Sequence, residues 1–181
     1  YPDPNYSHFR SMDIWYTAEP EKMATDGWLG KTVREIDPKA ENVLMAVRPG
    51  GSGDISQTHV AWTQTRGLPY VSSPLYYDGR VYLIKDGGLL SSFDAKTGER
   101  FYSQERLGTP GTYYASPVAA DGRLYVASLA GKLTVVRAGG DSPEVLHQVD
   151  FGERLFATPA LVEDTMYVRT QTRLYAFRTT D

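Results

Sequence analysis

The sequence predicts an all-β fold in which blades of four antiparallel strands repeat along the chain. One observation is a Ser-Pro or Thr-Pro step that recurs at residues 73–74, 116–117 and 158–159, at spacings of 43 and 42 residues. Another is Asp-Gly at 78–79 and 121–122, a sequence typical of type I′ hairpin turns because both central residues take positive φ. A period near 42 residues indicates a repeat architecture, and a four-stranded β-propeller blade has ~40–45 residues.

The repeat covers most of the chain. Residues 1–42 match it poorly and form an N-terminal segment or insertion, whereas residues 43–181 are interpreted as propeller blades. We expect a partial blade, two complete blades and a second partial blade at residues 43–66, 68–108, 111–152 and 154–181. The sequence therefore predicts about three and a half to four blades and an incomplete ring.

Turn signals at residues 78–79, 86–88 and 94–99 divide the first complete blade into four strands. They are expected at residues 71–77, 81–85, 89–94 and 100–106. Pro74, Pro117 and Pro159 occupy one equivalent place in the repeat. Because proline cannot donate a hydrogen bond to a neighbouring strand, these prolines predict an edge strand, which is the innermost strand of a blade.

The ends of the chain leave the ring open in this interpretation. The last blade lacks its fourth strand, and residues 12–17 (Met-Asp-Ile-Trp-Tyr-Thr) form a candidate strand that could complete it. Alternatively, the partner strand lies outside this sequence. Because the chain begins at Tyr1 without an apolar signal segment, we expect it to be a piece of a longer protein.

Composition excludes several classes of protein. The net charge is −3 and no two Lys or Arg residues are adjacent, so no nucleic-acid-binding face is expected. The longest apolar run, residues 43–47, is far shorter than the ~20 residues of a membrane-spanning helix. There are no cysteines and only three dispersed histidines, so no disulfide, thiolate metal site or His-rich metal site is expected.

The sequence of one turn in the repeat resembles that of a known family. Asp94-Ala-Lys-Thr-Gly-Glu99, inside a period near 42 residues, resembles the PQQ-like (quinoprotein-type) β-propeller repeat. In that repeat the turn is followed by a docking Trp, for which this chain has Tyr102 and His147, and only Trp62 keeps the family residue. The resemblance implies seven or eight blades, so we interpret this chain as the C-terminal portion of a larger propeller.

The resemblance also implies two kinds of function. PQQ-dependent dehydrogenases of this fold use a vicinal Cys pair, acidic and Asn calcium ligands and a Trp floor. This chain has no Cys, and we can place neither the calcium ligands nor the Trp floor. Non-enzymatic relatives, such as the propeller lipoprotein of the outer-membrane β-barrel assembly machinery, need only the repeat.

We therefore expect a non-catalytic binding or scaffold module for protein or other macromolecular partners, without cofactor or metal, in the periplasm or secreted. One alternative is a fragment of a PQQ-dependent oxidoreductase that binds PQQ and calcium largely outside this chain. A second alternative is a saccharide-binding module. The open ring suggests that a protein partner, the remaining half of the propeller or a second copy of the chain completes it.

The best candidate binding residues lie where connectors between blades enter the inner strands. Aromatic side chains precede these strands, and charged side chains come from the loops between second and third strands. The set is Tyr70, Lys85, Asp86, Tyr113, Tyr114, Phe156 and Arg169. Aromatic and charged groups at a propeller mouth suit a peptide or a saccharide. In the alternative interpretation, the aromatic side chains pack between blades.

Overall fold

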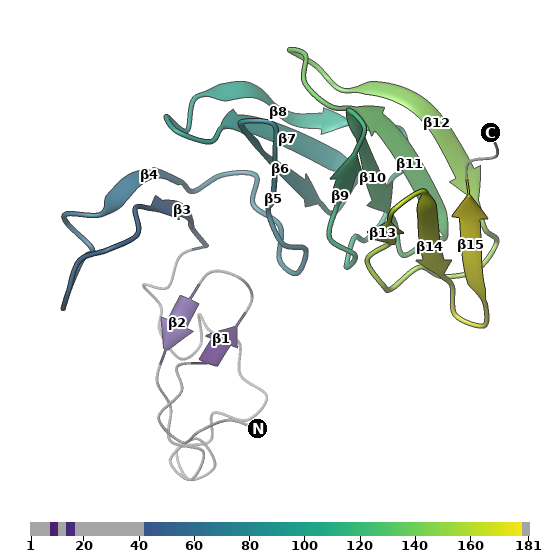
Figure 1. Ribbon diagram of the computed structural model, residues 1–181, viewed down its shortest axis with the longest axis horizontal. Coiled ribbons are helices and arrows are strands. Elements are labelled where there is room, and N and C mark those ends of the chain that lie inside the picture. Colours follow the sequence, from purple (N-terminus) through teal and green to yellow (C-terminus); the bar gives the residue numbers. More distant parts are fainter. Residues whose placement is uncertain (1–7, 11–13, 17–41, 179–181) are drawn as a thin grey trace, which may run out of the picture.

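The computed structural model describes residues 8–10, 14–16 and 42–178, and every regular element in these ranges is a β-strand (Figure 1). The strands form antiparallel sheets that follow one another along the chain and fan outward. The prediction of an all-β fold with four-stranded antiparallel blades and an incomplete ring is confirmed.

Two sheets in the middle of the chain are complete four-stranded blades, each with strands in sequence order. The first contains β5 (Leu75–Tyr77), β6 (Arg80–Lys85), β7 (Leu89–Asp94) and β8 (Arg100–Arg106). The second contains β9 (Val118–Ala120), β10 (Arg123–Ala127), β11 (Lys132–Arg137) and β12 (Glu144–Asp150). β7 and β8 have the predicted bounds, whereas β5 begins four residues later than the predicted 71–77 strand.

Three smaller sheets contain the remaining described strands. β3 (Leu44–Val47) pairs with β4 (Val60–Gln64), close to the strands expected in the partial blade 43–66. β13 (Ala160–Val162), β14 (Thr165–Arg169) and β15 (Leu174–Arg178) form a three-stranded sheet. β1 (His8–Arg10) pairs with β2 (Ile14–Tyr16).

β2 is the central part of the strand predicted at residues 12–17. Met12, Asp13 and Thr17 lie outside the described residues, as does most of the poorly matching segment 1–42. Within the described part of the chain, β2 pairs with β1 and β15 is an edge strand. Completion of the last blade by this segment stays a prediction.

The hairpin turns between inner strands have the predicted backbone. Asp78 and Gly79 have φ values of 47° and 75°, and Asp121 and Gly122 have 49° and 69°. In the third copy Glu163 takes a φ of 53°, so the turn forms there without the Asp-Gly pair. Two-residue turns with positive φ match the twist of the strands that they join, which fixes the register of each inner hairpin.

The inner strands β5, β9 and β13 are the innermost members of their sheets and are linked by one repeated contact. The Ser73 N–H donates to the Ser116 hydroxyl at 2.8 Å, and the Ser116 N–H donates to the Thr158 hydroxyl at 2.9 Å. The Ser-Pro or Thr-Pro step therefore has two roles. Proline directly precedes each inner strand, where no hydrogen-bond donor is needed. The hydroxyls of Ser116 and Thr158 each accept a hydrogen bond from the segment before the previous blade.

The core lies between successive sheets. One cluster joins the two complete blades through buried side chains on both, among them Tyr82, Ile84, Leu90, Leu124 and Val136. A second joins the second complete blade to the last sheet through Ala115, Ala127, Leu133, Leu155 and Val168. Each blade buries its apolar faces only against its neighbours, as expected for a repeat architecture.

Trp62 on β4 docks onto the Asp94–Glu99 turn of the next blade. Its Nε1–H donates to the Ala95 carbonyl at 3.1 Å, and its ring lies against Gly98. Asp94 holds the turn by accepting from the backbone N–H groups of Lys96 and Thr97, and these bonds, Thr97 first, lower the pKa of Asp94. In the corresponding places of the later blades, Tyr102 is buried and His147 is exposed.

Candidate functional site

The connectors between blades and the turns between second and third strands lie on one side of the sheets. The Gly87 N–H donates to the Gly111 carbonyl at 2.7 Å, and the Leu129 N–H donates to the Thr112 carbonyl at 2.8 Å. The Phe151 N–H donates to the Gly131 carbonyl at 2.9 Å. We call this side the mouth; it contains connectors 107–117 and 151–159 with turns 86–88, 128–131 and 170–173.

Two predicted aromatic residues form an exposed pair at the mouth. Tyr114 and Phe156 occupy equivalent positions of successive connectors and are 42% and 50% exposed. Their ring centroids are 6.4 Å apart, within the range of favourable aromatic pairs. Tyr70 is also exposed, at the start of the first complete blade.

Tyr113, the neighbour of Tyr114, has a different environment. Its side chain is 2% exposed, and its hydroxyl lies 2.6 Å from the Thr109 hydroxyl and donates to the Thr109 carbonyl at 2.7 Å. Burial raises the pKa of the Tyr113 hydroxyl. For this residue the structure supports the alternative interpretation, packing between blades.

The predicted charged residues differ in their roles. The Asp86 carboxylate accepts from the Tyr113 N–H at 2.7 Å, so it anchors the connector to the β6–β7 turn. Lys85 is half-buried at the end of β6. Arg169 is exposed at the end of β14 and, together with Phe156, lines a hollow of about 220 Å³.

Ala157, Thr170 and Gln171 complete the lining of the hollow, which is mainly apolar. The exposed residues Phe156, Arg169 and Gln171 border it, whereas the Thr170 hydroxyl is buried and bonded to Glu153. Such a set can hold an apolar group beside a carboxylate, since Arg binds carboxylates through planar paired hydrogen bonds.

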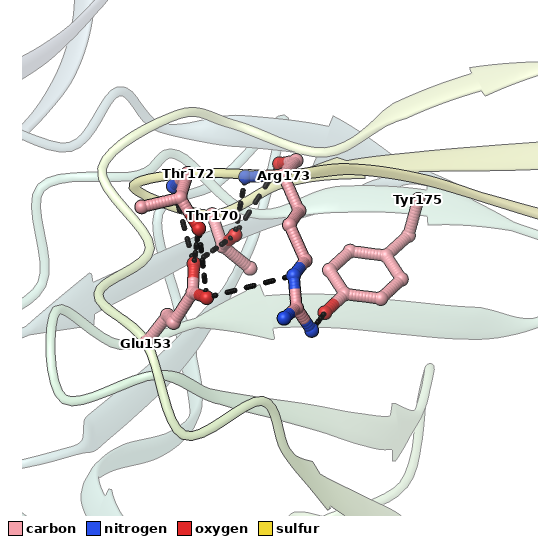
Figure 2. Close-up of polar contacts among 5 residues, drawn as sticks. All are labelled: Glu153, Thr170, Thr172, Arg173 and Tyr175. Carbon is pink, nitrogen blue, oxygen red and sulfur yellow. Dashed lines mark hydrogen bonds and ion pairs between the residues drawn. The ribbon is translucent and has the colours of Figure 1, made fainter.

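Glu153 positions the turn that contributes Thr170 and Gln171 to the lining of this hollow (Figure 2). Its carboxylate accepts from the Thr170 hydroxyl at 2.6 Å, the Thr172 hydroxyl at 2.8 Å and the Thr172 N–H at 3.1 Å. The Arg173 Nε lies 3.9 Å from the carboxylate and extends the network toward Tyr175. These hydrogen bonds, Thr170 first, hold the pKa of Glu153 below its usual value.

Sequence reasoning did not identify Glu153, Thr170 or Gln171. The equivalent residue of the previous connector is Thr109, because Leu107 and Phe151 donate to equivalent glycine carbonyls two residues earlier in each connector, so the repeat gives no signal for an acidic residue. The contact joins a connector to a turn 17 residues away in sequence. No local motif predicts such a pairing.

The described residues do not fit the metal of a quinoprotein site. Within residues 8–10, 14–16 and 42–178, no three His, Cys, Asp or Glu side chains lie close enough to hold a metal ion. Calcium in such sites needs several oxygen ligands, among which carboxylates are prominent. We therefore derive no reaction step through calcium or PQQ.

Comparison with protein families gives one match, to the family described as outer membrane protein assembly factor BamB, over residues 41–181. The chain belongs to this family. The match covers every blade that the sequence predicted and begins close to the start of β3. The resemblance to a PQQ-like propeller repeat is thereby confirmed.

Solved structures show the same fold at low sequence identity. BamB from Moraxella catarrhalis matches with a TM-score of 0.52 at 15% identity, over 66% of this chain and 36% of that one. The computationally designed Ika4 protein matches with a TM-score of 0.56 at 12% identity, over 78% of this chain and 88% of that one. This BamB-family chain thus spans about a third of the length of the BamB structure. Comparison with curated proteins gave no match.

Proposed function

We propose that this chain is part of a non-catalytic propeller that serves as a binding or scaffold module for protein partners, in the periplasm. The observation that carries the proposal is the exposed Tyr114–Phe156 pair beside the hollow of Arg169. Aromatic and Arg side chains are the groups most enriched at protein interfaces. Membership of a family described as an outer membrane assembly factor supports a scaffold role.

The chemistry of the mouth favours an extended protein segment with an apolar side chain next to a carboxylate. The apolar side chain would pack on Phe156, and the carboxylate would pair with Arg169. The exposed amide of Gln171 would supply a neutral hydrogen-bonding group for the backbone of the segment. The described residues contain no helix that could cross a membrane.

Fluorescence anisotropy with short labelled peptides tests this proposal. Each peptide carries Leu or Phe beside Asp or Glu, and a matched peptide carries Asn or Gln in place of the acid. We expect the acidic peptides to bind more tightly, Arg169→Gln to abolish that preference and Phe156→Ala to weaken both sets severalfold. Leu146→Ala is the matched control, because Leu146 is an exposed apolar residue on the outer strand β12.

Two outcomes would contradict the proposal. Equal effects of Phe156→Ala and Leu146→Ala would show that the mouth has no special role in binding. Binding of the intact chain to a glycan array, with loss in Phe156→Ala and no peptide binding, would favour the saccharide alternative. Tyr113 is unsuitable as a binding variant, because its truncation would disturb the packing between blades.

A further inference from the structure

The β3–β4 sheet is less buried than the equivalent strands of the complete blades. β3 and β11 have the same irregularity in their pairing with the following strand. The register shifts after Ala46 in β3 and after Val135 in β11, so Val47 is equivalent to Val136. Val136 is 0% exposed, whereas Val47 is 52% exposed. Val136 packs in the cluster that faces the preceding blade, and no described sheet covers Val47 in that way. β11 is also paired on both edges, with β10 and β12, whereas within the described residues β3 pairs only with β4, so no strand covers its other edge.

A groove marks the place where that cover is missing. It has a volume of about 500 Å³ and lies between β3 and the first complete blade. Met45 of β3, Trp62 of β4 and Tyr76 of β5 are among its lining residues. Met45 and Tyr76 are exposed large side chains there. An open strand edge next to exposed apolar side chains is a site for strand pairing.

The β1–β2 hairpin has the register of an inner hairpin of a blade. It contains three residue pairs, as do β5–β6, β9–β10 and β13–β14. In every case the last pair, farthest from the turn, places Tyr on the second strand. These pairs are His8 with Tyr16, Leu75 with Tyr82, Val118 with Tyr125 and Ala160 with Tyr167.

We propose that β1 and β2 are the two inner strands of the first blade, with β2 paired to the free edge of β3. The pairing of Tyr125 with Val135 and of Leu124 with Val136 sets the register. It places Tyr16 opposite Ala46 and Trp15 opposite Val47. The groove is then covered by the hairpin, and the edge of β3 gains the hydrogen bonds that a central strand needs.

This arrangement extends the mouth. β2 ends and β3 begins at the mouth, where turns 86–88 and 128–131 join the second and third strands of the complete blades. The first blade differs from them in having residues 17–43 between these strands, which accounts for the poor match of the N-terminal segment to the repeat. The hairpin is thereby part of the propeller rather than a separate insertion.

Cysteine cross-linking tests the register, and the chain has no native cysteine to interfere. We expect the pair Tyr16→Cys and Ala46→Cys to form an intramolecular disulfide on mild oxidation, since opposite residues of paired strands have Cβ atoms ~5 Å apart. The matched control combines Tyr16→Cys with Leu146→Cys on β12 and should stay reduced. Peptide mass spectrometry and non-reducing gels identify the products.

An intermolecular disulfide would overturn the proposal in favour of a second copy at the groove. The absence of any Tyr16–Ala46 disulfide, or equal oxidation of the control, would also overturn it. Hydrogen exchange of the unmodified chain provides a second measurement that needs no cysteine. We expect the edge amides of β3 to exchange about tenfold faster in Trp15→Asp, while β10 and β11 keep their protection. Equal exchange of β3 in both proteins would refute the pairing.

Discussion

Replacing Gly98 by Ala tests how closely the first sheet docks onto the first complete blade. Gly98 has a φ of 73°, which L-residues rarely adopt. A Cβ atom at this position would lie 2.7 Å from Cγ and Cδ2 of the Trp62 ring. The ring cannot simply move away, because its Nε1–H is bonded to the Ala95 carbonyl.

The magnitude follows from two costs. Positive φ at a residue with a Cβ costs about 1 kcal/mol, and overpacking a close contact costs about 1–3 kcal/mol. We therefore expect Gly98→Ala to lower the free energy of unfolding by about 2–4 kcal/mol. Gly79→Ala is the matched control, since Gly79 has a φ of 75° and a Cβ there would meet nothing within 4 Å. It should cost only about 1 kcal/mol.

Urea denaturation followed by circular dichroism measures both variants and their combination with Trp62→Ala. In the Trp62→Ala background the cost of Gly98→Ala should fall toward that of Gly79→Ala, because the ring atoms at 2.7 Å are gone and only the Cβ of residue 62, at 3.0 Å, remains. The comparison cancels the effect of Gly→Ala on the unfolded chain, which is similar at both sites. Equal costs of the two substitutions in the native background would refute the docking of Trp62 on Gly98.

Three further predictions use the same measurement. Tyr113→Phe should lower the free energy of unfolding by about 1–2 kcal/mol, because it leaves buried hydrogen-bonding groups unpaired. Tyr114→Phe, at the exposed neighbour, should change it by less than about 0.5 kcal/mol. Glu153 has a pKa below its usual value of 4.5, so it stabilises the fold above that pH and the contribution is lost as the pH falls through its lowered pKa. The stability difference between the native chain and Glu153→Gln should therefore shrink on acidification, and a constant difference from neutral to acidic pH would contradict the assignment. Ser116→Ala should cost about 0.5–1 kcal/mol, because the Ser73 N–H loses its acceptor, and an unchanged unfolding midpoint would argue against the contact.

The strands and turns of the complete blades could be predicted because their signals are local. The turns at residues 86–88 and 94–99 bound β7 and set the start of β8, and both strands have the predicted bounds. The Asp-Gly pair at 78–79 requires positive φ, which is a property of the two residues themselves. The inner strand β5 is shorter than expected. Of the residues before it, Ser73 donates to Ser116 in front of the next blade, and the Ser72 hydroxyl donates to the Ile84 carbonyl of β6.

The candidate site was predicted only in part. Tyr113 and Tyr114 are adjacent and identical in type, yet one is buried between sheets and the other is exposed at the mouth. A sequence contains no information on which of two neighbouring aromatic residues faces an adjacent blade. Glu153 was missed because its partners lie on another turn, and no repeat position marked it.

The period of the sequence determined the fold of this protein. Prolines and turn glycines recur near every 42 residues and act through local backbone geometry, whereas the recurring hydroxyl residues accept hydrogen bonds from the neighbouring repeat. The tertiary structure alone decided which side chains are available for binding. Exposure depends on whether a neighbouring sheet covers a position, as the contrast between Val47 and Val136 shows. Packing between blades is a cooperative property of the assembled sheets, and residues such as Ser73 and Ser116, 43 positions apart, become neighbours only when two blades meet.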